Sequence, residues 1–567
     1  MSSTSIGTGT VVQIGGRTII SGSASGIDTS ALVEAAYQAR LSEARKLADK
    51  VDINNNKGSA YAQLQDMLLN VQSSLTNLKR VYGSSTTNNS VFNKKAGTLA
   101  SSTATDPSTL LAVGVNAGAV KGDYEIEIVS KATAQKVRGT DVASNTAALG
   151  YTGTFDIQLS GGTAASINVT AGMTLQQLAA AINTQSTTSR VAASVVKVSD
   201  TAYQLVLTGL DTAQDIQITS TGGDDVMNLL GVTDGVGGFN NEVQASGQAE
   251  LVIDGITIFR NTNSFSDAIS GVQFNILKAE PGNTMTLSVT EDYSSVKTGI
   301  LDFVDAYNEL RDFVIQNQTL VDGVASEDAF LYKDQQLSSL NLELQTILSG
   351  TFTNSAGFTN LRNIGFTFTA TNKIALQDEA KLDSAIIDNF DSVKALFETQ
   401  FSSDNAQFNI VANTSRTKSL NIAMDITHDG SSITSVSVGG DANLFDIVGN
   451  LIRGKTGTVY EGLSFAYIGT TSTTVNLTVE QGIADLVSGV TKRYGDELTG
   501  SIQKAINSLA QDNERMEARA DSVRERAEAY RDRLIEKYAK FEEQLAASKA
   551  LLAQLRAILG TDKRDDR

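Results

Sequence analysis

The chain has 567 residues, with 63 acidic and 45 basic side chains and a formal net charge of −18. It contains no Cys, no Trp and a single His, which excludes thiol catalysis, disulfides, zinc–thiolate sites and two-histidine metal sites. The acidic balance argues against nucleic-acid binding and against docking on an anionic membrane, and no stretch reaches the ~20 apolar residues of a membrane span.

The N-terminal end combines a polar segment with a helical pattern. Residues 1–26 are rich in Ser, Thr and Gly, which is typical of a loosely held segment, and they lack the features of a cleaved signal peptide. Asp28 or Ser30 can cap a helix that continues to Val51. We expect the polar residues 54–58 to interrupt this helix.

A second helix is predicted directly after the interruption. Its apolar residues alternate at steps of three and four, which is the pattern of a coiled-coil or bundle seam: Tyr61, Leu64, Leu68, Val71, Leu75, Leu78 and Tyr82.

Two hairpins and a short helix are predicted in the first half of the middle region. Alternating residues in 111–115 and 124–128 predict one hairpin, and those in 155–159 and 167–169 predict another. Thr174 and Gln177 form a capping box at the start of the helix. Single strands are then expected at residues 191–198, 203–207, 216–219, 251–259 and 285–289.

The second half of the middle region returns to helices and then to strands. Helical patterns cover residues 296–314 and 382–397. Residues 420–426 and 433–438 alternate on either side of a turn that contains His428, and strands follow at 459–467 and 474–479. We assign His428 to the turn surface because no catalytic partners accompany it.

The strongest local pattern lies at the C-terminal end. From Ile502 to Leu559, small or apolar residues recur at steps of three and four, which predicts a helix about 87 Å long. The rhythm breaks between Leu534 and Tyr538, and such a stutter locally unwinds a supercoil. The seam is small before the break and bulky after it, so we expect the bulky part to dock on another subunit or on a filament.

The composition and pattern favour a structural protein. A helix this long overhangs any single domain, which favours assembly over a monomer. The sequence contains no recognisable phosphate-binding loop, no ligand spacing typical of a zinc site and no nucleophile–base pair. We therefore expect no enzyme activity, no cofactor and no metal. The predicted fold class is multidomain α+β, with long terminal helices that form coiled-coil or bundle legs and β-rich modules inserted between them. The expected assembly interface is the seam of both ends: Tyr61, Leu64, Leu68, Val71, Leu75, Leu78, Tyr530, Leu534, Phe541, Leu545, Leu552, Leu555 and Leu559.

An ordered series of short motifs resembles one known family. The opening ISGSASGIDTSALV (20–33) and SAYAQL (59–64) are followed by GDYEIEI (122–128), RNTN (260–263) and SDAISGV (266–272). The series continues with FVDAYN (303–308), DSVKALF (391–397), YRDRL (530–534) and FEEQL (541–545). In this order they resemble the flagellar filament cap family, hook-associated protein 2. Residues 174–207 also resemble the small β-α-β repeat of flagellin-class axial proteins.

The resemblance implies a function and a set of partners. A member of this family would sit outside the cell at the distal tip of the bacterial flagellum, as a homo-oligomeric ring of about five subunits. It would retain exported flagellin and promote its folding and insertion into the filament. Export would use the flagellar type III apparatus and an export chaperone, without signal cleavage, and hook–filament junction proteins would be neighbours. The alternative is a surface adhesin whose outer β modules bind host or mucin ligands.

The resemblance and the patterns together predict a domain division. Residues 1–48 and 492–567 would form terminal helical legs, flexible in isolation. Residues 49–98, 293–401 and 478–491 would form a helical bundle, and 99–138 with 245–292 an inner β domain. Residues 139–244 would form an outer β domain with the flagellin-type repeat. Residues 402–477 exceed what we expect between the family's core helices, and we predict that they form an extra surface β domain.

Overall fold

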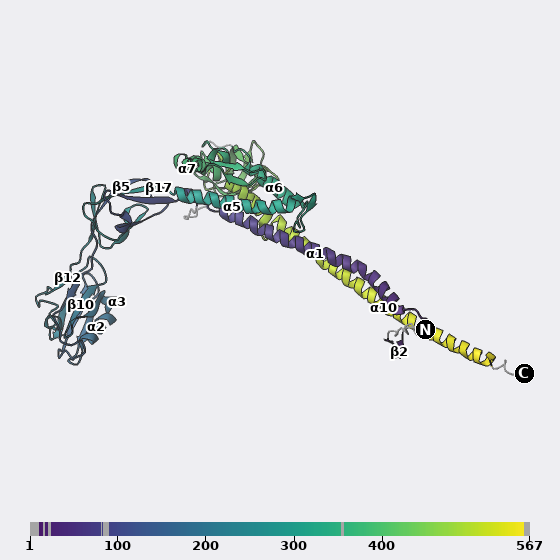
Figure 1. The fold of residues 1–567 in the computed structure, drawn as a ribbon. Helices are drawn as coiled ribbons and strands as arrows, with labels where there is room; N and C mark the ends of the chain where they lie inside the picture. Colours follow the sequence, from purple (N-terminus) through teal and green to yellow (C-terminus); the bar gives the residue numbers. More distant parts are fainter. Residues whose placement is uncertain are drawn as a thin grey trace. The chain divides into compact units, whose positions relative to one another are not determined.

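A computed structural model describes residues 11–14, 17–20, 24–80, 82, 90–352 and 356–560 (Figure 1). The fold is multidomain α+β, with long terminal helices and β-rich modules between them, as predicted. The chain divides into two compact units, one of residues 1–86 and 297–567 and one of residues 87–296. Among the described residues, no helix is long and apolar enough to cross a membrane.

The N-terminal helix is longer than predicted. Before it, β1 (Val11–Ile14) pairs antiparallel with β2 (Arg17–Ile20), and the rest of the segment predicted to be loosely held, apart from residues 24–26, lies outside the described residues. Helix α1 (Thr29–Leu75) begins at the predicted cap, where the Asp28 carboxylate accepts a hydrogen bond from the Ala31 amide. It passes through residues 54–58 without a break, so the predicted interruption is wrong.

The continuity of α1 has a tertiary cause. The Asn54 side chain donates to Asn513 Oδ1 over 2.9 Å, and Asn513 donates to Asn55 Oδ1 over 2.8 Å. Side chains that favour turns in isolation are therefore used to pair two helices. At its other end the helix stops at Leu75, so Leu78 and Tyr82 do not belong to it, contrary to the prediction.

Among the described residues, six further helices belong wholly or mainly to the first unit, and α9 lies against α1, α6, α8 and α10. Their bounds are α5 (Tyr293–Gln318), α6 (Gln335–Leu348), α7 (Glu379–Asp388), α8 (Phe390–Phe397), α9 (Ile483–Gly495) and α10 (Ser501–Gly560). The predicted helix 382–397 is two helices, because Asn389 leaves the helical region between them with φ −131° and ψ 42°. Two small hairpins accompany the helices: β18 (Leu320–Val321) with β19 (Val324–Ala325), and β20 (Phe366–Phe368) with β21 (Ile374–Leu376).

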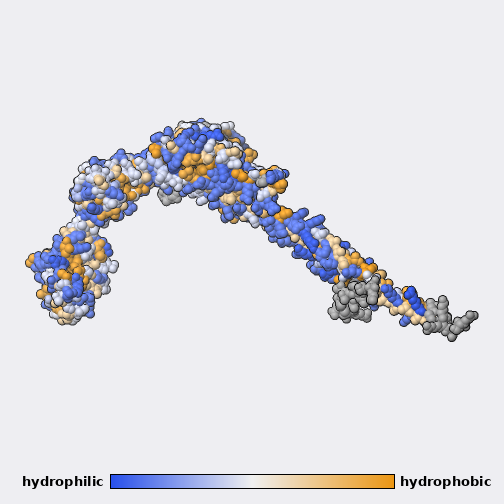
Figure 2. Space-filling model, viewed as in Figure 1, coloured by the Kyte–Doolittle hydropathy of each residue, from blue (hydrophilic) through white to orange (hydrophobic). Residues whose placement is uncertain are grey.

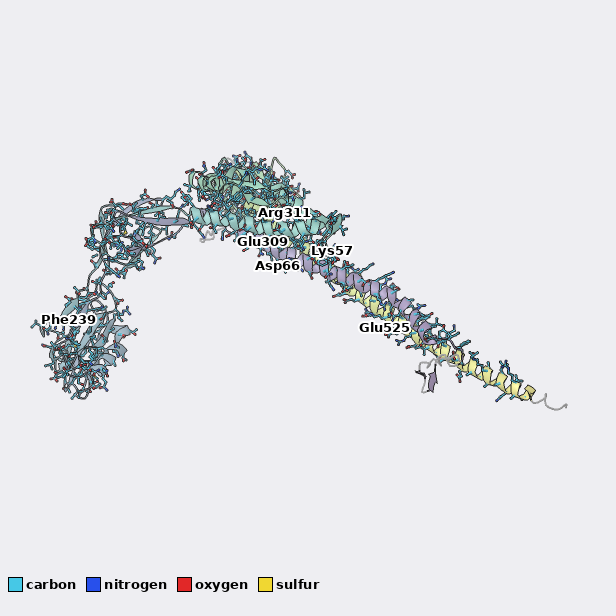
Figure 3. All side chains as sticks on the ribbon, viewed as in Figure 1. Lys57, Asp66, Phe239, Glu309, Arg311 and Glu525 are labelled. Carbon is cyan, nitrogen blue, oxygen red and sulfur yellow. The ribbon has the colours of Figure 1, made fainter. Side chains whose placement is uncertain are left out.

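Side-chain hydrogen bonds fix α5 against its neighbours. Arg311, labelled in Figure 3, is buried and donates from Nε and Nη2 to the Thr371 carbonyl over 3.1 and 2.6 Å. Its Nη1 donates to Asn341 of α6. The guanidinium therefore satisfies a loop carbonyl and joins α5 to α6 at once.

Eight strands between α8 and α9 form two four-stranded sheets with an apolar core of their own. In one sheet the order is β22 (Gln400–Ser403), β29 (Thr473–Glu480), β24 (Ser419–His428) and β25 (Ile433–Val438). In the other it is β23 (Phe408–Asn413), β28 (Leu463–Tyr467), β27 (Leu451–Gly454) and β26 (Phe445–Val448). The hairpin of β24 and β25 is confirmed, whereas the strand expected at 459–467 begins only at Leu463. That residues 402–477 form a separate domain stays a prediction.

A buried acid joins this sandwich to the helices. Asp485 of α9 accepts hydrogen bonds from the amide and hydroxyl of Thr399, over 3.1 and 2.8 Å, and from the Tyr82 hydroxyl over 3.1 Å. Asn413 of β23 donates to Thr399 Oγ1 and to Tyr82. Burial raises the pKa of Asp485 despite these donors.

The second unit contains two apolar cores. The first lies between a five-stranded sheet in the order β14-β13-β5-β17-β3 and a three-stranded sheet in the order β15-β16-β4. The strands are β3 (Lys95–Ser101), β4 (Leu111–Val115), β5 (Gly122–Ser130), β13 (Ala249–Ile253), β14 (Ile256–Arg260), β15 (Ser264–Ile269), β16 (Val272–Ile276) and β17 (Thr284–Glu291).

Two strand predictions in this core are wrong. β4 and β5 do not form a hairpin: β4 pairs with β16, and β5 pairs with β13 and β17. Alternation shows which face of a strand is buried but not which strand lies beside it. The strand expected at 251–259 is a hairpin, because Asp254 and Gly255 both have positive φ, 50° and 79°, as a tight type I′ turn requires.

The second core confirms the sequence patterns closely. Its sheets have the orders β12-β6-β10-β9 and β11-β7-β8, and helix α2 (Leu175–Thr184) packs on them from its predicted capping box. The strands are β6 (Lys136–Arg138), β7 (Gly153–Leu159), β8 (Ala165–Val169), β9 (Val191–Ser199), β10 (Ala202–Gly209), β11 (Ile216–Gly223) and β12 (Glu242–Gln244). Two single turns, α3 (Ser186–Ser189) and α4 (Val226–Leu229), complete it. The boundary predicted between inner and outer β domains stays a prediction.

Candidate assembly surface

The long helices α1 and α10 run antiparallel and side by side (Figure 1). We call α1 residues 29–56 and α10 residues 511–560 the leg. The apolar seam of the leg is a small cluster: Ala44 and Leu47 pack on Ala520 and Val523, with Met516 beside them. The two alanines allow the helices to approach closely, and a cluster of this size buries little apolar area.

Cation–π pairs and one ion pair flank this seam. The Arg40 guanidinium lies 3.9 Å from the centre of the Tyr530 ring, and the Arg531 guanidinium lies 5.0 Å from the centre of the Tyr37 ring. The two pairs are reciprocal, as an antiparallel arrangement allows. Arg519 also pairs with Glu43 over 2.6 Å. These directional contacts help to fix how α1 and α10 face each other, because the seam itself has little apolar surface.

The chain that precedes α1 clasps α10 near residue 542. The Glu542 carboxylate, which is only 3% exposed, accepts hydrogen bonds from the amides of Ala24 and Ser25 over 2.9 and 3.1 Å and from the Ser25 hydroxyl. Lys549 donates to the Ala24 carbonyl. Burial opposes ionisation of Glu542, but the donors of Ser25 and Ala24 outweigh it and lower the pKa of this carboxyl.

Beyond this clasp, α10 continues past the start of α1 (Figure 1). Bulky apolar residues at the clasp and beyond it are largely uncovered: Phe541, next to Glu542, is 49% exposed, and farther along Leu552 is 53% and Leu555 47% exposed. In Figure 2 the middle of the leg is mostly hydrophilic, and hydrophobic colour appears toward its end. Large apolar side chains gathered on one exposed stretch mark a surface that another protein covers.

The structure divides the thirteen predicted interface residues into buried and accessible sets. The six from α1 and its C-terminal extension are at most 4% exposed and belong to the core of the unit: Tyr61, Leu64, Leu68, Val71, Leu75 and Leu78. In α10, Tyr530, Leu534 and Leu545 are half-buried, and Phe541, Leu552 and Leu555 are exposed. The side chain of Leu559 lies outside the described residues.

Packing against α9 explains the burial in α1. The Gln65 side chain donates to the Gly495 carbonyl over 3.1 Å, and a Cβ at Gly495 would lie 2.9 Å from Leu68 Cβ. Only glycine lets the two helices come this close. Tyr61 donates to Asp334 over 2.6 Å, and Lys57 pairs with the same carboxylate over 3.3 Å. Figure 3 labels Lys57 and Asp66 on α1, and Glu525 on α10.

Sequence reasoning missed the Glu542 clasp. Both partners lie in segments that carry the family resemblance, residues 20–33 and 541–545. Their order in the chain gives no sign that they touch, since 517 and 518 positions separate the hydrogen-bonded residues. The one available signal was an acidic residue, Glu542, directly beside the seam position Phe541.

In the part of the chain that the structure describes, no group of three or more His, Asp or Glu side chains could hold a metal ion.

Comparison with known proteins decides the family. The model of the flagellar hook-associated protein 2 C-terminus matches residues 246–550, and that of its N-terminus matches residues 25–135. The chain belongs to the flagellar hook-associated protein 2 family. The flagellin hook IN motif matches residues 151–211, which confirms the resemblance of this segment to flagellin-class proteins.

Individual members of the hook-associated protein 2 family are distant relatives. Flagellar hook-associated protein 2 of Aeromonas caviae is 25% identical over 387 residues, covering 66% of this chain and 80% of the relative. The B-type protein of Pseudomonas aeruginosa is 28% identical over 308 residues, covering 51% of this chain and 64% of its own length. The crystal structure of D1-D2-D3 domains of the flagellar cap protein FliD from Escherichia coli covers 60% of this chain and 90% of that chain, at 25% identity and a TM-score of 0.46.

Proposed function

We propose that this protein caps the distal tip of the flagellar filament, retains exported flagellin and promotes its folding and insertion. Family membership supports the site of action, and relatives carry the name flagellar cap protein. The observation that carries the mechanism is the end of α10, where Leu552 and Leu555 lie half exposed beyond the clasp and Phe541 lies half exposed beside it. The proposal assigns binding and geometry to the chain, with no bond-making chemistry.

The two parts of the first unit suit different tasks in this proposal. The helices around α9 have a fully buried apolar core. Such a core suits a part of the protein that must stay folded while one flagellin subunit after another is inserted. The apolar cluster of the leg is small, so the leg can open and close at low cost. We expect the leg to be mobile in the free protein and to order in a ring of about five copies closed by cyclic symmetry.

The remaining partners follow from the same proposal. The protein would leave the cell through the flagellar type III export apparatus, escorted by an export chaperone, and would act outside the cell. A leg that opens easily also helps a chain that must be unfolded for export. Flagellin and the hook–filament junction proteins would be its neighbours.

The experiment is complementation of a strain that lacks the gene. Without the protein, cells should carry hooks without filaments and leak flagellin monomers into the medium. The wild-type chain should restore filaments. The double variant Leu552→Asp with Leu555→Asp should be exported and folded but should fail to restore them, because two charges replace the apolar docking surface.

A matched control separates docking from charge. Gln544 and Gln554 are exposed on the same stretch of α10, and Gln544→Asp with Gln554→Asp adds the same two charges without removing apolar area. This control should restore filaments. Filaments of normal length with the leucine double variant would refute the docking role, and normal filaments in the deletion strain itself would refute the cap function.

A further inference from the structure

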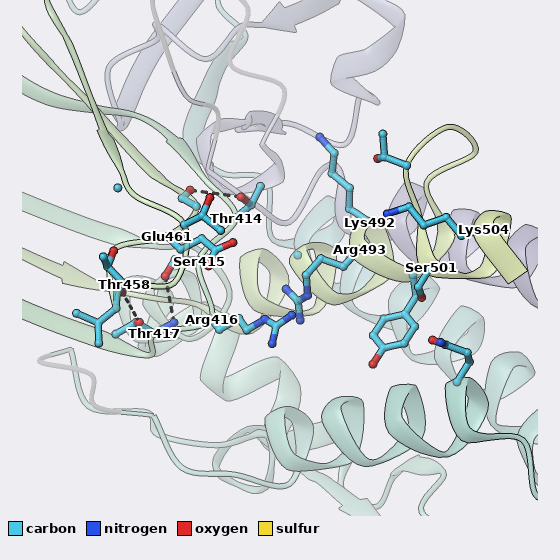
Figure 4. Close-up of a pocket in the computed structure, with 18 residues that line it drawn as sticks. Thr414, Ser415, Arg416, Thr417, Thr458, Glu461, Lys492, Arg493, Ser501 and Lys504 are labelled. Carbon is cyan, nitrogen blue, oxygen red and sulfur yellow. Dashed lines mark hydrogen bonds between the residues drawn. The ribbon is translucent and has the colours of Figure 1, made fainter. Parts of the chain in front are cut away.

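A cavity of about 770 Å³ opens between the β sandwich and the helices of the first unit (Figure 4). Loops 414–417 and 454–462 of the sandwich form one wall. The C-terminal turn of α9 and the start of α10 form the other. The volume lies within the range of about 300–1,000 Å³ that is usual for small-molecule sites. It has no role in the leg or its clasp.

The lining of this cavity is basic although the chain as a whole is acidic. Four cations line it: Arg416 from the sandwich, Lys492 and Arg493 from α9, and Lys504 from α10. One carboxylate, Glu461, also lines it, and its Oε2 accepts a hydrogen bond from the Gly457 amide over 2.9 Å. In a protein with a net charge of −18, a local excess of cations marks a place that favours negative charge.

The two guanidinium groups are incompletely neutralised. Figure 4 shows those of Arg416 and Arg493 close together. They share the carboxylate of Glu343, which pairs with Arg493 Nη2 and lies 3.8 Å from Arg416 Nε. Burial, and then the positive charge of Arg416, lower the pKa of Arg493, while Glu343 opposes both. Two adjacent cations that share one carboxylate carry a net positive charge, which attracts a further anion.

Two polar atoms of the residues that line the cavity have no hydrogen-bond partner. Among the described residues, Arg493 Nε and Ser501 Oγ are buried and have no hydrogen-bond partner, and both residues line the cavity. A buried donor without an acceptor is costly, so each such group calls for an explanation. Neither atom is open to the cavity in this conformation, so the cationic side chains of the lining are the groups available to carboxylate or phosphate oxygens.

From this cluster of cations we propose that the cavity binds a small, multiply charged organic or inorganic anion through its carboxylate or phosphate groups. Arg416 and Arg493 would hold one charged group through their guanidinium groups. Lys492 and Lys504 are exposed side chains at the rim and would hold a second charged group. Because the site joins sandwich to helices, an anion bound there would tie the two together.

The test is calorimetric titration of the full chain with citrate and, separately, with pyrophosphate, at constant ionic strength in chloride buffer. We expect saturable one-to-one binding of at least one probe. Lys492→Gln with Lys504→Gln should weaken it by at least about tenfold, because charge-assisted hydrogen bonds are roughly twice as strong as neutral ones. Both lysines are exposed, so the variant should fold, which circular dichroism checks.

The control removes two positive charges elsewhere. Lys46 and Lys537 are exposed on the leg, and Lys46→Gln with Lys537→Gln should leave the affinity unchanged. Tighter binding of citrate would identify a carboxylate site, and tighter binding of pyrophosphate a phosphate site. No saturable binding of either probe would overturn the proposal, as would equal affinity in the Lys492/Lys504 variant and the wild type.

Discussion

The two halves of α1 belong to the same continuous helix but face different environments. In the C-terminal half, Leu64, Leu68, Val71 and Leu75 are completely buried among α9 and its neighbours. In the N-terminal half the buried apolar side chains are fewer and more widely spaced (Val33, Ala44, Leu47 and Val51), and polar contacts with α10 surround them. The comparison teaches that a regular heptad pattern sets the face of a helix that is covered, while tertiary neighbours set how much apolar area that face buries.

This difference predicts unequal stability along one helix. The helices that bury the C-terminal half of α1 are called the body here. Burial of large side chains stabilises the body, whereas the leg depends on a small apolar cluster, cation–π pairs and the clasp at Glu542. Opening of the leg should therefore cost much less free energy than unfolding of the body. The following changes test that contrast, from the largest expected effect to the smallest.

The largest effect is expected in the body. Leu64 is 0% exposed, and Leu64→Ala should lower the free energy of unfolding by about 2–5 kcal/mol, since it removes buried methyl groups and leaves a cavity. Leu552→Ala is the control at an exposed position and should change it by less than about 0.5 kcal/mol. Urea unfolding followed by far-UV circular dichroism measures both. Similar losses for the two variants would contradict the contrast between body and leg.

The stability contributions of Glu542 in the clasp and of Asp485 near α9 should change with pH in opposite directions. The pKa of Glu542 is lowered in the folded chain, so its contribution is complete above the ordinary pKa of about 4.3 and is lost as the pH falls. The pKa of Asp485 is raised by burial, so its contribution is present below the ordinary value of about 3.9 and is lost as the pH rises through the raised value. Acidification should therefore loosen the leg before the body.

Hydrogen exchange at the amides of Ala24 and Ser25 measures this, after correction for the intrinsic pH dependence. Glu542→Gln should speed their exchange by about tenfold at neutral pH, a change of about 1.4 kcal/mol, and should remove the pH dependence. Exchange that stays pH-dependent in this variant would assign the effect to another group.

A smaller effect is expected at the asparagine contact in the leg. Asn513→Ala removes the hydrogen bonds with Asn54 and Asn55, and we expect leg opening to become easier by about 1 kcal/mol. Gln511→Ala, an exposed neighbour on α10, is the control. Hydrogen exchange of the leg amides in both variants reports the difference, and equal rates would show that the asparagines do not hold the helices together.

The smallest effect is expected at the surface ion pair of the leg. Arg519 and Glu43 are 2.6 Å apart, with side chains 65% and 52% exposed. A double-mutant cycle with Arg519→Ala and Glu43→Ala should give a coupling energy below about 0.5 kcal/mol, because water screens exposed pairs. A coupling above about 1 kcal/mol would mean that this pair contributes more than its exposure allows.

Local sequence chemistry predicted much of the structure correctly. The Asp28 cap, the capping box of α2, the hairpin of β24 and β25 and the extent of α10 each depend on residues close together in the chain. In the candidate site, the bulky residues of α10 were recognised from their spacing. That they dock on a partner stays a prediction.

Other features could not be predicted because their cause lies far away in the sequence. The seam from Tyr61 to Leu78 resembles an interface seam, yet α9 and other helices of the same chain cover it. The polar residues 54–58 resemble a turn, yet they are helical, and Asn54 and Asn55 form side-chain hydrogen bonds with Asn513 of α10. Periodicity reports that a face is covered, and it does not report which surface covers it.

The sequence by itself therefore determined the helix caps, the buried faces of the strongly periodic segments and the family to which the motifs point, because caps and periodicity are local properties. Only the tertiary structure decided that β4 pairs with β16, that Ser25 reaches Glu542 and that four cations surround one cavity. These pairings join residues tens to hundreds of positions apart, and their free energies depend on the packing of the whole unit and not on any short segment.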